Sequence, residues 1–311
     1  MRPTTQTPEQ KTNSNYQKKK NMRGNWEKGL MSIAYVLAFL CIQGLAGAIV
    51  MVGTTMTGGN ETMTTGTAMT TGTETGTAMT STATQTMITM VLFSVLTVVV
   101  FVWARWFRPT ADYLRSRPWT VVAWSTVAAL GAIAPSMFGQ ELLPEWPDWI
   151  QRIIDETEQQ FALLMQQRGG YFVVALLAPL VEEMVFRGAV LRTLLDWQPC
   201  RRWLMIGLSA LLFAAAHLNP GQMPHAFVIG LLLGWMYSRT ESIVPGVVFH
   251  WANNTAAYLL FVAYPDPSIE LRDLFGGSVG RELAAVGFSL CILLPALYQL
   301  DQNMKKASGH D

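Results

Sequence analysis

Long apolar runs separated by short polar stretches dominate the chain. A helix needs roughly 20 apolar residues to cross the core of a bilayer. Eight runs approach or exceed this length, at about 29–52, 87–107, 118–138, 170–195, 203–218, 224–238, 243–263 and 281–300. The pattern predicts an all-α fold, a polytopic transmembrane helical bundle with about eight spans. The fifth and sixth runs are the shortest, and tilted or partly re-entrant helices are the alternative for them.

Composition agrees with a membrane location. Half of the residues are hydrophobic (50%) and only 14% are charged, with a mean hydropathy of +0.26. A net charge of +1 gives no electrostatic reason to expect a nucleic-acid partner, so the lipid bilayer is the predicted surrounding. The cysteines Cys41, Cys200 and Cys291 have unrelated spacings, which indicate neither a zinc site nor a disulfide framework.

The distribution of basic residues predicts the topology. Seven Lys and Arg residues lie in the tail at 1–28, and the next is Arg105. By the positive-inside rule the N-terminus is cytoplasmic. Eight spans then place further basic groups on the same side, at Arg105, Arg108, Arg115, Arg117, Arg192, Arg201, Arg202, Arg239, Lys305 and Lys306. We expect a multi-pass protein of the inner (cytoplasmic) membrane with both termini cytoplasmic.

Two stretches between the runs differ from the rest. Residues 53–86 form a threonine, glycine and methionine tract in which TGTAMT occurs at 65–70 and again at 75–80. Such a composition predicts a disordered outer loop, with a hydroxyl-rich stalk or partner-binding loop as the alternative. Residues 147–167 place apolar side chains along one helical face, which predicts a helix lying on the membrane surface. A segment packed only against neighbouring helices is the alternative.

The fourth run contains charges that need an explanation. In LVEEMVFRGAVLR (180–192), Glu183 and Arg187 are four residues apart and can pair along one helix face. Glu182 is rotated by about 100° from Glu183 and is left without that partner. An ionised side chain in the bilayer core costs a few kcal/mol, so these groups face protein or water. Either they lock helices together or they belong to a site.

Two later runs add polar groups at helical spacing. FAAAHLNPGQ contains Phe213 and His217 four residues apart, and VFHWANNT contains His250 and Asn254 four residues apart. A single such residue is more often an interfacial or packing group. A glutamate, two histidines and an asparagine on three runs favour a site, although proton-coupled transporters also concentrate such residues.

At these residues the chain resembles the CAAX protease and bacteriocin-processing family (CPBP, or Abi) of intramembrane proteases. The family's motifs are two glutamates followed after three residues by an arginine, a phenylalanine four before a histidine, and a histidine four before an asparagine or aspartate. They match, in order along the chain, Glu182, Glu183 and Arg187, then Phe213 and His217, then His250 and Asn254. The resemblance covers roughly residues 165–265.

The resemblance implies a membrane-embedded endopeptidase acting on a peptide or protein substrate in or at the membrane. Glu182 and His217 would activate a water, and His250 and Asn254 would stabilise the oxyanion. Glu183, Arg187 and Phe213 would support these groups. Paired donors in a water-poor cavity stabilise developing negative charge strongly.

A metalloprotease is the alternative within the enzyme class, because Glu182, His217 and His250 could ligate zinc with an open position for water. The chain has no HExxH motif, and these residues have no familiar zinc spacing. We therefore favour a metal-free glutamate mechanism with no cofactor. Ser209, in GLSA, lacks the final glycine of a rhomboid-type motif and reads as a packing residue. His225, at the start of the sixth run, reads as interfacial, and lining of the entrance to the site is the alternative.

A non-catalytic membrane protein is the competing class, either a transporter or a bacteriocin-immunity protein on the same scaffold. The runs show no internal repeat of the kind that many transporters have. The predicted organisation is a basic tail (1–28), a first transmembrane anchor (29–52), the outer loop (53–86), further spans with the interfacial helix (87–168), the catalytic helical core (169–265), and the last span with a cytoplasmic tail (266–311).

Overall fold

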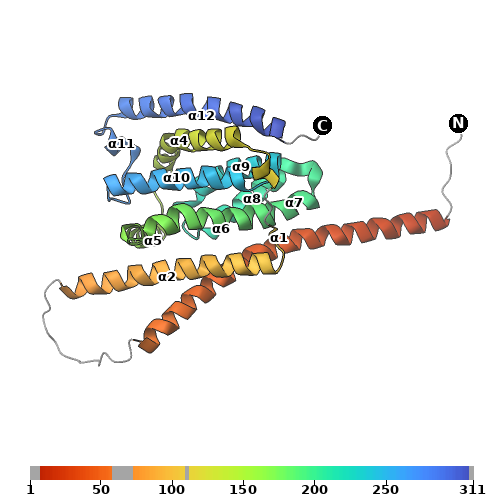
Figure 1. The fold of residues 1–311 in the computed structure, drawn as a ribbon, viewed down its shortest axis with the longest axis horizontal. Helices are drawn as coiled ribbons and strands as arrows, with labels where there is room; N and C mark the ends of the chain where they lie inside the picture. Colours follow the sequence, from red (N-terminus) through yellow and green to blue (C-terminus); the bar gives the residue numbers. More distant parts are fainter. Residues whose placement is uncertain (1–7, 58–72, 109–111, 308–311) are drawn as a thin grey trace.

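The computed structural model describes the backbone of residues 8–57, 73–108 and 112–307, and the side chains of residues 26–55, 83–108 and 112–304. The described chain is 85% helix and contains no strand. The predicted all-α class is confirmed. Figure 1 shows a bundle of roughly parallel and antiparallel helices with a long helical hairpin along one side.

The hairpin consists of α1 (Pro8–Thr57) and α2 (Thr73–Trp103), which separate toward the ends that their connection joins (Figure 1). Aromatic side chains fasten it to the bundle. The ring of Phe39 lies 4.9 Å from that of Phe93 on α2 and 5.4 Å from that of Phe186 in the bundle. Edge-on aromatic pairs of this kind add to the free energy of apolar packing.

The threonine tract differs from its prediction at both ends. The sequence predicted disorder throughout 53–86, but α1 continues to Thr57 and α2 begins at Thr73. Extending an existing helix is much easier than starting one, and the hydroxyls of Thr54 and Thr55 donate to backbone carbonyls within α1, at 2.8 and 2.9 Å. Residues 58–72, including much of the repeated segment, lie outside the described residues.

On the opposite side of the bundle, α4 (Trp119–Glu141) lies between α10 (Val244–Ala263) and α12 (Val279–Ala307), as Figure 1 shows. The buried face of α4 carries the small residues Ala128, Ala129 and Ala132. Small side chains let helix backbones approach closely where no water is available to drive association. The short helices α3 (Asp112–Arg115) and α11 (Leu271–Leu274) lie in the connections.

The centre of the bundle contains α8 (Arg202–Ala216), α9 (Met223–Thr240) and a long irregular helix. Along the chain, the irregular helix comprises a π-helical segment η1 (Phe172–Leu177), α6 (Ala178–Val185), a second π-helical segment η2 (Phe186–Leu191), α7 (Arg192–Trp197) and a 3-10 turn η3 (Pro199–Arg201). This helix was predicted as one uninterrupted span at 170–195.

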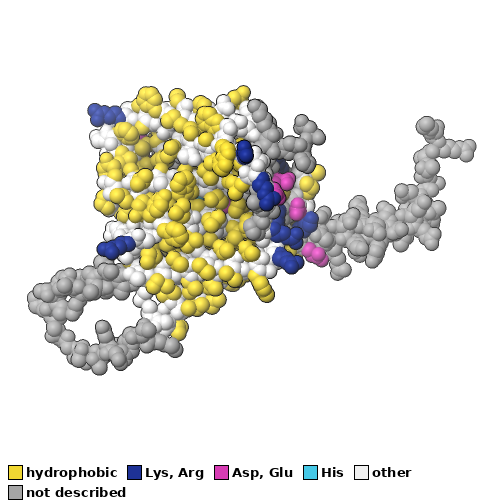
Figure 2. All heavy atoms as spheres, viewed as in Figure 1, with side chains coloured by type: hydrophobic (Ala, Val, Ile, Leu, Met, Phe, Trp, Pro, Cys, Tyr) yellow, Lys and Arg dark blue, Asp and Glu magenta, His cyan; other side chains and the backbone are white. Residues whose placement is uncertain are grey.

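Within the described residues, four helices are long and apolar enough to cross a membrane: 26–55, 83–103, 119–141 and 279–304. They coincide with the predicted first, second, third and last spans. The other four predicted spans are helices too, but the count of eight is not confirmed. Figure 2 shows hydrophobic side chains over most of one face, with Lys and Arg gathered mainly at the edge from which α1 leaves the bundle. The chain is a membrane protein.

The predicted surface helix is present as α5 (Asp148–Gln166). Its apolar face packs inward, because Ile154, Leu164 and Met165 are buried, whereas Trp149 is 62% exposed. Helix α5 contacts α2. One face therefore meets protein, and the exposed tryptophan is of the type that favours a membrane interface.

Candidate active site

The helix that carries the first motif is irregular for a reason that lies in its sequence. Pro179 has no N–H, and the N–H of Ala178 donates to the carbonyl of Val173. Neither residue can donate to the carbonyl of Val174, which is therefore free for a side chain. Such π-helical turns are frequent at functional sites.

Asn254 uses that carbonyl. Its Nδ2 donates to the oxygen of Val174 at 3.0 Å, which joins α10 to η1. The bond fixes the orientation of the amide and leaves its second N–H available. Asn254, the last residue of the third motif, is therefore anchored to a carbonyl that Pro179 leaves free, and Pro179 lies in the helix that carries the first motif.

Glu183 and Arg187 form the ion pair that their spacing predicts. Arg187 Nη1 donates to Glu183 Oε1 at 2.7 Å, and both side chains are buried. Arg187 Nη2 donates to the carbonyl of Gly230 on α9 at 3.2 Å, and the guanidinium lies 4.4 Å from the ring centre of Phe213 on α8. A buried pair needs such additional contacts to offset the loss of hydration. The pair therefore ties η2 to α8 and α9.

His250 lies between the two glutamates. Its Nε2 is 3.7 Å from Glu182 Oε2, and its Nδ1 is 3.4 Å from Glu183 Oε1. The Nδ1 contact is not aligned as a hydrogen bond. The side chain of Glu183 is fully buried, whereas that of Glu182 is 22% exposed. Adjacent glutamates thus have different surroundings, and Glu182 is the accessible one.

His217 follows the last residue of α8 and turns back on it. Its Nδ1 lies 2.9 Å from the carbonyl oxygen of Phe213, and the two rings meet edge to face with centroids 4.8 Å apart. A carbonyl can only accept, so Nδ1 carries a proton in this contact, and in the neutral imidazole Nε2 then keeps its lone pair. Within the described chain, His217 makes no ion-pair contact with a carboxylate.

These groups line one cavity of about 400 Å³. Glu182, His217, His250 and Asn254 all border it, together with Phe213. The predicted site residues of three motifs are therefore brought together, with Glu183 and Arg187 buried behind them. Further polar residues that line the cavity are Gln43, Ser94, Gln140, Thr157, Gln222, His225, Asn253 and Tyr258.

Sequence reasoning missed several of these lining residues. Gln43 was overlooked although it is the polar amide in the middle of an otherwise apolar run, which was a usable signal. Asn253 was not predicted because, unlike its neighbour Asn254, it falls outside the third motif. His225, predicted to be interfacial, borders the cavity from the first turn of α9.

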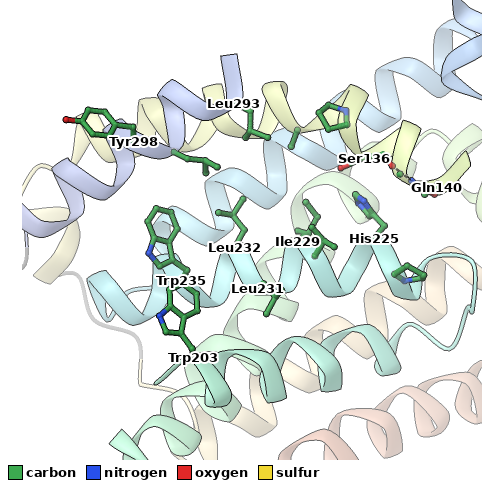
Figure 3. Close-up of a pocket in the computed structure, with 16 residues that line it drawn as sticks. Ser136, Gln140, Trp203, His225, Ile229, Leu231, Leu232, Trp235, Leu293 and Tyr298 are labelled. Atoms are coloured by element: carbon green, nitrogen blue, oxygen red, sulfur yellow. Dashed lines mark hydrogen bonds between the residues drawn. The ribbon is translucent and has the colours of Figure 1, made fainter. Parts of the chain in front are cut away.

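An apolar cavity of about 740 Å³ adjoins the first between α4, α9 and α12. Figure 3 shows Trp203 and Trp235 near one end of it, and Ser136, Gln140 and His225 at the other. Gln140, His225 and Ile229 border both cavities, so the two meet there. The site therefore has an apolar flank on this side.

The alternative chemistries can be compared with the arrangement. Ser209 is buried, and its hydroxyl donates to the carbonyl of Phe186 at 3.1 Å, which agrees with a packing role. Among the described residues, no three His, Cys, Asp or Glu side chains gather in a way that could hold a metal ion. Glu182, His217 and His250 thus do not fit a zinc site in this conformation, and a metalloprotease is unsupported.

Comparison with known proteins agrees with the motifs. Residues 166–256 match the family model of Rce1-like proteins, described as type II CAAX prenyl endopeptidase. The matched segment contains all three motifs, and the resemblance noted in the sequence is confirmed. No curated protein and no solved structure matches the chain. The match supports a CAAX-type membrane protease, whose substrate is a protein or peptide at the membrane.

Proposed function

We propose that this chain is an intramembrane endopeptidase that hydrolyses peptide bonds with a water activated by Glu182 and His217. The observation that carries the proposal is the convergence of Glu182, His217, His250 and Asn254 from three parts of the chain on one cavity. Polar side chains are costly among membrane helices and persist there mainly for function.

Glu182 suits the role of general base. Its neighbour Glu183 is occupied by Arg187, while the carboxylate of Glu182 is exposed to the cavity. A carboxylate within reach of a water in the cavity can take its proton during the attack. Because His217 Nδ1 faces the carbonyl of Phe213, Nε2 of the neutral ring can orient the same water by accepting one of its hydrogens.

His250 and Asn254 suit the role of oxyanion donors. They are one helical turn apart on α10 and line the same cavity. As the water oxygen bonds to the peptide carbonyl carbon, negative charge moves to the carbonyl oxygen, where N–H donors held in advance stabilise it. Glu182 takes the proton of the water and gives it to the amine nitrogen as the C–N bond breaks, yielding a carboxyl and an amino terminus.

The membrane arrangement is part of the same proposal. We place the catalytic core at 169–265, within eight spans of the inner membrane and with both termini cytoplasmic. The positions of Lys and Arg along the sequence support this orientation. Reaction of single cysteines, introduced in the predicted loops, with a membrane-impermeant maleimide tests it.

The activity is tested in cells that contain the wild-type protein or Glu182→Gln. The peptides and protein termini in their membranes are identified and compared. Loss of particular shortened termini in the variant, at equal membrane yield, is the expected result. Glu156→Gln is the matched control, because Glu156 is exposed on α5 and borders none of the cavities. Identical termini from Glu182→Gln and wild type would overturn the protease proposal in favour of a transporter or immunity protein.

A further inference from the structure

A cavity of about 340 Å³ lies between α1 and α2, where the two helices separate, and polar and apolar side chains both line it. The amides of Gln43 and Gln85 and the side chains of Thr54, Thr86 and Thr89 border it. Both helices are otherwise apolar enough to cross a membrane over 26–55 and 83–103. Polar side chains are thus concentrated on the inner faces of a hairpin whose outer faces are apolar.

Gln43 lies near the middle of the apolar stretch 26–55. Within the described chain its amide forms no hydrogen bond. An amide in apolar surroundings without a partner is unfavourable, because it has lost its hydrogen bonds to water. This cost is removed if a bound molecule supplies both a donor and an acceptor, as a peptide group does.

The gap between α1 and α2 leads to the candidate active site. Gln43, Met90 and Phe93 border both this gap and the cavity that contains Glu182. The gap therefore adjoins the cavity that contains the carboxylate proposed as the base. The opposite flank of the active site is the apolar cavity between α4, α9 and α12 (Figure 3), so of the two flanks only the gap between α1 and α2 offers the amides of Gln43 and Gln85 to a substrate.

The chemistry of the gap selects its occupant. A hydrocarbon chain would leave the amides of Gln43 and Gln85 unpaired, whereas an extended peptide offers an N–H and a C=O at every residue. Since α1 and α2 lie outside the segment 166–256 that matches the family model, the gap belongs to the part of this chain that the family match does not cover.

We propose that the gap between α1 and α2 is a binding site for an extended, unmodified peptide segment of the substrate, and that Gln43 pairs with its backbone beside the scissile bond. The inference rests on the proposed protease function, since it assigns this segment to the substrate of that reaction. It makes Gln43 a substrate-binding residue.

Glycines on α1 provide matched variants. A Cβ at Gly47 would meet only Thr89 Cγ2, at 4.0 Å, so a larger side chain there extends into the gap. A Cβ at Gly44 would meet nothing within 4 Å, and Gly44 borders none of the cavities. Gly47→Phe therefore blocks the gap, and Gly44→Phe controls for the same substitution on the same helix.

The first test uses two degenerate, internally quenched peptide libraries, one of about six residues and one of about twelve. The longer peptides are chosen to extend from the active site along the gap, and the shorter ones are not. With protein in liposomes, Gly47→Phe and Gln43→Leu should each lower kcat/KM for the longer library about tenfold, the worth of one or two hydrogen bonds. Gly47→Phe should change cleavage of the shorter library less than about twofold, whereas Gln43→Leu should slow both libraries, because Gln43 borders the active-site cavity as well as the gap. Equal cleavage of the longer library by Gly47→Phe and Gly44→Phe would overturn the inference while leaving the protease proposal standing.

Photo-cross-linking tests the same site without requiring cleavage. Benzoylphenylalanine replaces Thr89, which borders the gap, or Val95, which is 50% exposed on α2 and borders none of the three cavities described above. In a Glu182→Gln background, a biotinylated form of the longer library should label the protein at 89 and not at 95. Labelling without cleavage by the wild type would retain the peptide site and reject the protease; equal labelling at both positions would reject the site.

Discussion

Arg187 Nη1 donates to Glu183 Oε1 across 2.7 Å, and both side chains are buried. Glu182 precedes Glu183 in the chain but faces the cavity. Glu182 and Glu183 are therefore chemically identical neighbours in different surroundings. One carboxylate is held in a fixed position by a cation, and the other is left where a substrate could reach it.

Breaking the ion pair should destabilise the protein. Arg187→Met leaves the carboxylate of Glu183 buried without its cation, and losses of about 3–5 kcal/mol are typical of such changes. The double variant Glu183→Gln/Arg187→Met should recover part of the loss, because no unpaired charge remains. Unfolding of the detergent-solubilised proteins, followed against denaturant, measures both.

The pair of Arg115 with Asp112 supplies the control for that comparison. Its atoms are 3.3 Å apart, but its side chains are 78% and 77% exposed. Exposed pairs contribute at most about 1 kcal/mol, so Arg115→Met should leave the unfolding midpoint nearly unchanged. Equal effects of Arg115→Met and Arg187→Met on the unfolding midpoint would show that the burial of the Glu183–Arg187 pair has no energetic consequence.

Gly246→Ala should displace Glu183, which is buried behind the cavity. A Cβ at this position of α10 would lie 2.6 Å from Glu183 Oε2, too close for any real contact. The carboxylate or α10 has to move, which typically costs about 1–3 kcal/mol in a packed interior. We expect a lower unfolding midpoint and a loss of proteolysis, because His250 and Asn254 are also on α10.

Gly207→Ala is the control for replacing a helical glycine with alanine. Gly207 is on α8, and a Cβ there would meet nothing within 4 Å. Alanine is favoured over glycine within a helix by up to about 1 kcal/mol. The variant should therefore be as stable as the wild type or slightly more so, and fully active. Unimpaired Gly246→Ala would mean that the glycine is not needed for the position of Glu183.

Removal of the Asn254 amide should slow catalysis more than binding. The loss of one oxyanion donor typically lowers kcat about 10²–10³-fold, and KM should change little if the contact is made mainly in the transition state. Asn254→Leu tests this with a peptide that the wild type cleaves. The neighbouring variant Asn253→Leu changes the same cavity without changing the motif residue, so a similar fall in kcat for both would reject the assigned role.

Local spacing predicted much of the site. The separation of four residues between Glu183 and Arg187 was enough to predict their ion pair, and the motifs identified the helices that meet at the cavity. The contact between His250 and Glu182 depends on how α10 packs against α6, which no local pattern encodes. The π-helical turn at η1 also escaped prediction, although Pro179 is one of its causes, because a proline inside an apolar run is compatible with a simple kink as well as with a π-helical turn.

The fold was predictable to a similar extent. Apolar runs located the helices, since burial in lipid and burial in a helical core impose the same composition. For that reason they could not show which helices cross the membrane. Helix ends in the threonine tract were misplaced because composition reports an average preference, whereas Thr54 and Thr55 continue a helix that apolar residues have already begun.

Chelators should leave proteolysis unchanged. His217 Nδ1 lies beside the carbonyl of Phe213, and among the described residues no three His, Cys, Asp or Glu side chains are grouped so that they could hold a metal ion. A catalytic zinc ion requires three protein ligands, with nitrogen and oxygen at about 2.0–2.2 Å from a common centre. We therefore expect cleavage of a peptide by the purified protein to be the same before and after dialysis against a strong zinc chelator. Metal analysis of the active preparation should find zinc far below one ion per chain. Loss of cleavage on dialysis, with recovery on adding zinc to the wild type but not to His250→Gln, would instead establish a metalloprotease and require the site to rearrange around the ion.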